Sequence, residues 1–154
     1  MTQLYFEDFE VGRVLPLGPK TVLADEIIAF ATEFDPQPMH LSQEEAEKTI
    51  LGGLSASGWH TCAMMMRMMI DSYLGASASE GAPGIDVLDW KKPVLAGDVL
   101  TGTSTVVAAR PLRSRPAIGL ISFHHQLRNQ RGDLVLHAEN VNMIRRRGEG
   151  EATS

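Results

Sequence analysis

Residues 52–74 read GGLSASGWHTCAMMMRMMIDSYL and form the longest helix-like pattern in the sequence. Small residues open it, and apolar residues then recur every three or four positions, namely Trp59, Cys62, Ala63, Met66, Met69, Ile70 and Tyr73. Such spacing indicates an α-helix, and because few charges interrupt it, most of its faces should be buried. We therefore predict a central helix of about five turns, around which the rest of the chain packs.

The chain after residue 85 has the pattern of strands. Polar and apolar residues alternate within four segments, and turn sequences rich in Pro, Gly, Asn and Asp separate them. The segments are residues 85–94, 98–112, 117–130 and 133–144. We predict four antiparallel strands joined by hairpins.

The chain before the central helix is predicted to hold one strand and two short helices. Residues 14–23 favour a strand that is broken or bulged at its Gly-Pro pair. Residues 24–34 show helical spacing, with Asp25 as the expected N-cap, and residues 42–50 open with a Ser-x-x-Glu capping box. Together with the later strands, these elements predict an α+β fold in which one long helix packs on one face of an antiparallel sheet.

Composition narrows the class of protein. With 154 residues, of which 44% are apolar, the chain is expected to form a single domain over residues 1–147, followed by a flexible tail at 148–154. A net charge of −5 argues against a nucleic-acid partner, and we expect no membrane contact because no stretch is apolar enough to span a bilayer. The single cysteine, Cys62, rules out an internal disulfide framework and fits a cytoplasmic location.

The most suggestive short motif is FDPQPMH, residues 34–40. Its two prolines each fix φ, so the path between Asp35 and His40 is stiff. A carboxylate and an imidazole held in this way can share the activation of one water molecule. A structural reading stays open beside this one, in which Asp35 caps a turn and His40 only precedes the next helix.

A second candidate is Gly58, near the start of the central helix. A glycine at a helix N-terminus exposes backbone N–H groups that the helix dipole reinforces, which suits a developing oxyanion. The small residues there also fit an ordinary loop and N-cap. Five basic residues are candidates for the phosphates of a large anionic ligand, or else solvated turn charges: Lys91, Lys92, Arg110, Arg113 and Arg115.

The remaining histidines do not suggest a site. His124 and His125 are neighbours in a strand pattern and point to opposite faces, so they cannot share a site with each other. His60 and His137 are isolated in the sequence. We predict structural or surface roles for all four, and we predict no metal site, since no zinc-protease, Walker or dinucleotide-binding motif is present.

Three blocks of the sequence resemble a known family. In order they are FATEFDPQPMHLSQEEAEKT (30–49), GGLSASGWHTCAMM (52–65) and VLDWKKPVLAGDVLTG (87–102). They resemble the MaoC-like acyl dehydratases, the (R)-specific enoyl-CoA hydratase group of hot-dog folds. The resemblance covers nearly the whole chain up to about residue 144 and keeps the spacing of Asp35 and His40.

The resemblance implies a curved antiparallel sheet wrapped around the long helix, a homodimer, and an acyl-CoA thioester bound near the subunit interface. It implies that Asp35 and His40 activate the water that adds to C3 of a trans-2-enoyl-CoA, that the backbone N–H of Gly58 holds the thioester oxygen, and that no cofactor or metal is needed. Four residues depart from the family pattern and are expected to contact substrate, namely Gln37, Ser57, Trp59 and Met66.

Two other functions stay open on the same scaffold. Hot-dog proteins include acyl-CoA thioesterases, in which a water activated by a carboxylate attacks the thioester carbonyl instead of C3. A non-catalytic acyl-CoA-binding subunit would keep the fold and lose the chemistry. We favour the hydratase because the Asp-to-His loop ahead of the long helix resembles the hydratase pattern.

Overall fold

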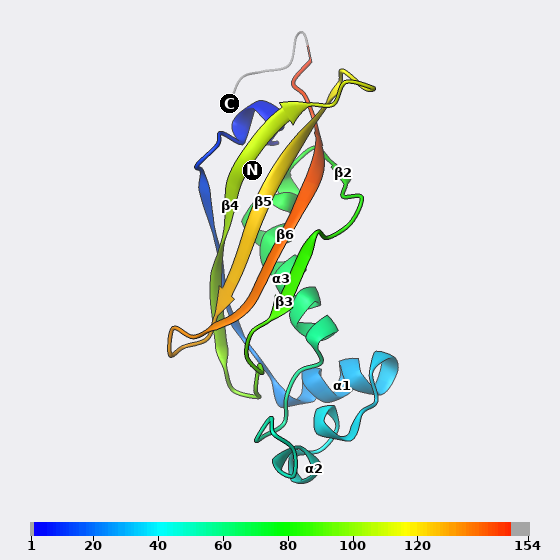
Figure 1. Ribbon diagram of the computed structural model, residues 1–154, viewed down its shortest axis with the longest axis vertical. Helices are drawn as coiled ribbons and strands as arrows, with labels where there is room; N and C mark the ends of the chain where they lie inside the picture. Colours follow the sequence, from blue (N-terminus) through cyan, green and yellow to red (C-terminus); the bar gives the residue numbers. More distant parts are fainter. Residues whose placement is uncertain (1, 149–154) are drawn as a thin grey trace.

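The computed structural model describes residues 2–148 as a curved antiparallel sheet with one long helix on its inner side (Figure 1). The helices are η1 (Phe6–Asp8), α1 (Ala24–Phe34), η2 (Pro38–His40), α2 (Gln43–Glu47), α3 (Gly58–Ser72) and η3 (Leu74–Ala76). The strands are β1 (Val14–Thr21), β2 (Ser79–Gly81), β3 (Val87–Trp90), β4 (Val99–Pro111), β5 (Ile118–Arg128) and β6 (Leu134–Arg145). The predicted tail lies outside the described residues from 149 onward.

The predicted central helix is α3, but it is shorter than expected. It begins at Gly58, because residues 52–57 are not helical and Ser55 forms an antiparallel bridge with Leu95 in the chain that follows β3. The Ala56 N–H donates to the Val94 carbonyl at 2.8 Å, and the Ala96 N–H donates to the Leu54 carbonyl at 3.0 Å. The glycines and serines of this stretch have lower helix propensity than most residues, and strand-like pairing replaces a first helical turn.

The sheet has the order β1-β4-β5-β6-β2, and β3 also pairs with β6. The prediction that all four later strands form successive hairpins is therefore wrong for β3, since only β4, β5 and β6 form a meander. Val87 lies opposite Glu139 and Trp90 lies opposite Leu136 in the β3–β6 register. After β3 the chain leaves the sheet, so β4 starts a new run beside β1 at the other edge.

The elements before α3 mostly follow the sequence pattern. The β1–β4 register shifts between Leu17 and Lys20, which confirms the predicted bulge. Helix α1 has the predicted bounds, but Leu23 is its N-cap, so Asp25 lies in its first turn instead of capping it. Helix α2 is shorter than predicted and is capped as expected by Ser42, whose side chain accepts from the N–H of Glu45.

The core between α3 and the sheet has an aromatic centre and a buried polar chain. Phe9, Tyr73 and Phe123 pack with ring centroids 5.5 to 6.1 Å apart. The Tyr73 hydroxyl donates to Ser104 Oγ at 3.1 Å, and Ser104 Oγ lies 2.8 Å from His125 Nδ1. Because burial raises the pKa of Tyr73 to about 12, its hydroxyl stays a donor. These hydrogen bonds give a partner to each polar group, and a buried polar group without a partner would destabilise the fold.

One face of α3 is apolar and exposed, contrary to the prediction that most of its faces are buried. The buried side carries His60, Thr61 and four methionines. The opposite side exposes an apolar stripe made of Trp59, Ala63, Met66 and Ile70. Within residues 2–148, no helix is long and apolar enough to cross a membrane.

Candidate active site

The motif FDPQPMH forms a tight loop at one end of the molecule, between α1 and α2 (Figure 1). Asp35 is the C-cap of α1, and its N–H donates to the Ala31 carbonyl at 2.9 Å. Gln37 then bonds Asp35 twice, through its backbone N–H at 2.8 Å and through its side-chain amide at 2.7 Å. Pro38 opens η2, which ends with a buried His40. The loop therefore fixes both ends of the Asp-to-His path.

The structure brings Asp35 and His40 together. His40 Nε2 lies 3.5 Å from Asp35 Oδ2, while the other ring nitrogen, Nδ1, lies 2.6 Å from the Ser55 carbonyl oxygen. Because a carbonyl only accepts hydrogen bonds, we assign the proton of a neutral His40 to Nδ1. The lone pair on Nε2 then faces the carboxylate of Asp35, so two acceptors confront each other across a short gap.

The carboxylate of Asp35 is held in its ionised form. The Ser57 hydroxyl is the main cause that lowers the pKa of Asp35, followed by the Gln37 amide and, more weakly, the charge of His40. Ser57 Oγ is buried, yet no partner lies in full hydrogen-bonding geometry, so its contact with Asp35 is weaker than a formed hydrogen bond. Asp35 is thus an acceptor, ready to take a proton or to orient a donor.

Gly58 is the first residue of α3, and Ser57, its N-cap, makes no side-chain capping bond. The first N–H groups of an α-helix have no acceptor within the helix and carry partial positive charge. Trp90 covers Gly58, since its indole N–H donates to the Gly58 carbonyl at 3.0 Å. A Cβ at position 58 would lie 2.5 Å from the Trp90 ring, so this close approach requires glycine.

These groups line one cavity of about 570 Å³. Its polar part includes Asp35, Gln37, His40 and Gly58. Its other walls are largely apolar, with Lys91 and Lys92 beside them, and include Ile50, Leu51, Trp59 and Trp90. The cavity therefore combines a few convergent polar groups with apolar walls, which is the usual composition of a small-molecule site.

The other sequence candidates divide between this cavity and the rest of the surface. Trp59 lines the cavity and meets Trp90 edge to face, with ring centroids 5.2 Å apart. Ser57 lies behind the wall, and Met66 lies two turns further along α3 with its side chain exposed, outside the lining of this cavity. The substrate contacts assigned to these residues stay predictions. The three candidate arginines lie on β4 or the loop after it, at the opposite end of the molecule (Figure 1).

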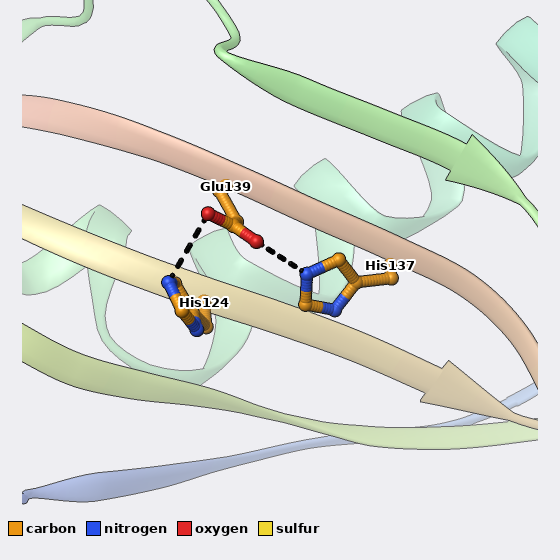
Figure 2. Close-up of side chains that lie close together, drawn as sticks. All are labelled: His124, His137 and Glu139. Carbon is orange, nitrogen blue, oxygen red and sulfur yellow. Dashed lines mark hydrogen bonds and ion pairs between the residues drawn. The ribbon is translucent and has the colours of Figure 1, made fainter.

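His137 is isolated in the sequence but not in the structure. His124 and His137 both contact Glu139 on the sheet face turned away from α3 (Figure 2). The alternation of His124 and His125 is confirmed, because His124 is half-buried and His125 is buried. His60 is not isolated either, since it stacks on Phe30 with ring centroids 4.8 Å apart.

The sheet wrapped on α3 has the hot-dog fold, as predicted, and the family and relatives that match this chain are those of a hydratase or dehydratase enzyme. The chain belongs to the MaoC-like family, because the family model described as "MaoC like domain" matches residues 9–118. The predicted family and fold class are both confirmed.

Individual relatives agree with this assignment. The crystal structure of a MaoC-like dehydratase from Rhodospirillum rubrum has a TM-score of 0.84 and 38% identity, covering 94% of this chain and 99% of that one. The 3-hydroxybutyryl-CoA dehydratase of Methylorubrum extorquens is 32% identical over 73% of this chain and 69% of its own. The (R)-specific enoyl-CoA hydratase of Rhodospirillum rubrum is 32% identical over 70% of this chain and 72% of its own.

Proposed function

We propose that this protein adds water reversibly across the C2–C3 double bond of a trans-2-enoyl-CoA and gives the (3R)-hydroxyacyl-CoA. The observation that carries the proposal is the pair of acceptors described above. Asp35 Oδ2 and His40 Nε2 lie 3.5 Å apart at the wall of the cavity, and neither has a proton to offer the other when His40 is neutral. A water molecule that donates one proton to each would satisfy both and turn its lone pair toward the cavity.

The proposed reaction uses each of these groups. The water oxygen bonds to C3 while the Asp35 and His40 pair takes one water proton. The electrons of the C2–C3 double bond move toward the thioester carbonyl, and the Gly58 N–H stabilises the oxyanion of the resulting enolate. The protonated member of the pair returns a proton to C2, so atoms and charge balance. Dehydration is the same sequence in reverse.

The substrate class and the assembly are part of the proposal. Lys91 and Lys92 stand at the cavity wall, each half-exposed, and suit the phosphates of coenzyme A. Two of the three relatives given above have names that include a CoA thioester. We propose a homodimer in which a second copy covers the exposed apolar stripe of α3, because such a stripe on a helix is rarely left in water.

The test is a hydration assay with crotonyl-CoA and longer enoyl-CoA esters, following the loss of enoyl absorbance. We expect Asp35→Asn and His40→Ala to lower kcat/KM by about 10²-fold or more, since each removes half of the pair that positions the water. Asp25→Asn, which changes an exposed carboxylate in the first turn of α1, is the matched control and should keep full activity.

Two further readouts separate the alternatives. Chiral analysis of the product tests the (R) assignment, and a thiol reagent detects any hydrolysis of the thioester. Release of free coenzyme A without loss of the double bond would show a thioesterase instead. Wild-type activity that survives unchanged in both pair variants would refute the proposed roles.

A further inference from the structure

The outer face of the sheet carries a cluster that the proposed reaction does not use. Glu139 reaches both neighbouring histidines (Figure 2), with Oε1 3.3 Å from His124 Nε2 and Oε2 2.7 Å from His137 Nε2. One nitrogen or oxygen atom from each of the three residues lies within 4.8 Å of the others. Among residues 2–148, these are the side chains of His, Cys, Asp and Glu that gather closely enough to hold a metal ion.

The backbone brings these side chains together, so the cluster does not depend on a mobile loop. His137 and Glu139 are two residues apart on β6 and share a face of the sheet. His124 lies directly opposite Glu139 in the β5–β6 register. Residues opposite each other in an antiparallel pair have Cβ atoms about 5 Å apart. The ladder of hydrogen bonds thereby sets the spacing of all three residues.

We propose that His124, His137 and Glu139 bind a divalent transition-metal ion of the zinc type, with water completing the coordination. Zinc bonds to imidazole nitrogen and carboxylate oxygen at about 2.0 to 2.2 Å, so tetrahedral ligand atoms lie roughly 3.3 Å apart. The two contacts to Glu139, at 3.3 and 2.7 Å, are close to this value, and the three ligand atoms all lie within 4.8 Å of one another, so metal binding would require small rotations of the side chains. Two imidazoles and one carboxylate select zinc, copper or nickel over calcium and magnesium.

The residues around the cluster add negative charge, and the cluster is accessible to an ion from solvent. Side-chain exposures of 43% for His124, 18% for His137 and 33% for Glu139 keep the cluster partly buried but open to solvent. Asp89 on β3 lies opposite His137 and adds negative charge beside Glu139. Gln126 Nε2 lies 3.3 Å from His137 Nδ1, and the same amide, turned over, can accept the proton that Nδ1 carries once Nε2 binds metal.

The alternative is a carboxylate that only forms hydrogen bonds with two histidines. The experiment titrates Zn²⁺ into chelator-treated wild-type protein and follows it by calorimetry and thermal melting. The proposal expects saturable binding of one ion per chain and a rise in Tm, because a metal that binds the folded state stabilises it. Cobalt, used in place of zinc, should give the visible absorption bands typical of a tetrahedral site.

Variants assign the ligands. His124→Gln, His137→Gln and Glu139→Gln should each weaken Zn²⁺ binding by at least about tenfold and abolish the cobalt bands. His60→Gln removes a histidine outside the cluster and should bind zinc like wild type. The proposal is overturned if wild type shows no saturable binding, or if the three cluster variants bind as tightly as wild type. The wild-type titration tests the proposal even if one variant fails to fold.

Discussion

Replacing Gly58 by alanine gives a sharp test of the active-site geometry, because one methyl group meets a fixed neighbour. The new Cβ would lie 2.5, 2.8 and 2.9 Å from three atoms of the Trp90 ring. Ordinary contacts begin near 3.4 Å, so the shortest of these distances must grow by 3.4 − 2.5 = 0.9 Å. The indole cannot move this far without stretching the bond from its N–H to the Gly58 carbonyl, now 3.0 Å.

The magnitudes follow from that displacement. Losing the indole hydrogen bond costs about 1 kcal/mol, and overpacking costs about 1 to 3 kcal/mol, nearer the lower end here because Trp90 is 46% exposed and can shift. The larger effect is on catalysis, since a misplacement of about 1 Å near the reacting atoms lowers the rate roughly 10²-fold. We expect Gly58→Ala to lose about 10²-fold in kcat/KM for crotonyl-CoA while it stays folded.

The assay pairs enoyl-CoA hydration with a thermal melt. Gly84→Ala is the control, because a Cβ at Gly84 meets nothing within 4 Å, and this variant should match wild type. In a Trp90→Ala background the clash is absent, so adding Gly58→Ala should cost much less than it does alone. Wild-type activity and Tm in Gly58→Ala would refute both the packing argument and the role given to the Gly58 amide.

Three more predictions concern the pair, the pH response and the core. Ser57→Ala removes the main cause of the lowered pKa of Asp35, so the acid limb of the kcat/KM profile should move to higher pH; an unmoved limb contradicts the contact. Burial lowers the pKa of His60 below its usual 6.5, so the unfolded chain binds more protons below that pH. Stability should therefore fall from about pH 6.5 downward, and less steeply in His60→Phe, as measured by urea midpoints. Phe123→Ala should cost about 3 to 5 kcal/mol of unfolding free energy, whereas Phe34→Ala, at a 65% exposed side chain, should cost under about 1 kcal/mol; equal losses would contradict the assigned core.

Local sequence signals predicted much of the fold. Helical spacing gave the bounds of α1, and the Ser-x-x-Glu box identified the cap of α2. The prolines correctly indicated that Asp35 and His40 lie close together. These predictions succeeded because each depends on dihedral angles or hydrogen bonds within a few residues, and such preferences are written in the local sequence.

Long-range strand pairing cannot be predicted from local sequence signals. Nothing in the residues of β3 shows that they pair with β6 instead of β4, because antiparallel partners are chosen by the whole sheet. The cluster of His124 with His137 was missed for the same reason. The His-x-Glu spacing on β6 was a visible signal, but only the β5–β6 register places His124 opposite Glu139. The contact of Trp90 with Gly58 likewise joins residues far apart in the sequence, so local signals do not predict it.

Because β3 pairs with β6, a strand that comes later in the sequence, the order of synthesis affects when the cavity can form. Trp90, one wall of the cavity, is placed by a strand whose partner residues, 136–139, are near the C-terminal end. During synthesis Asp35, His40 and the N-terminus of α3 leave the ribosome before β6, the strand with which β3 pairs. We expect ribosome-bound chains that stop before β6 to lack enoyl-CoA affinity. We therefore expect an enoyl-CoA site that includes Trp90 to form only after β6 has joined the sheet.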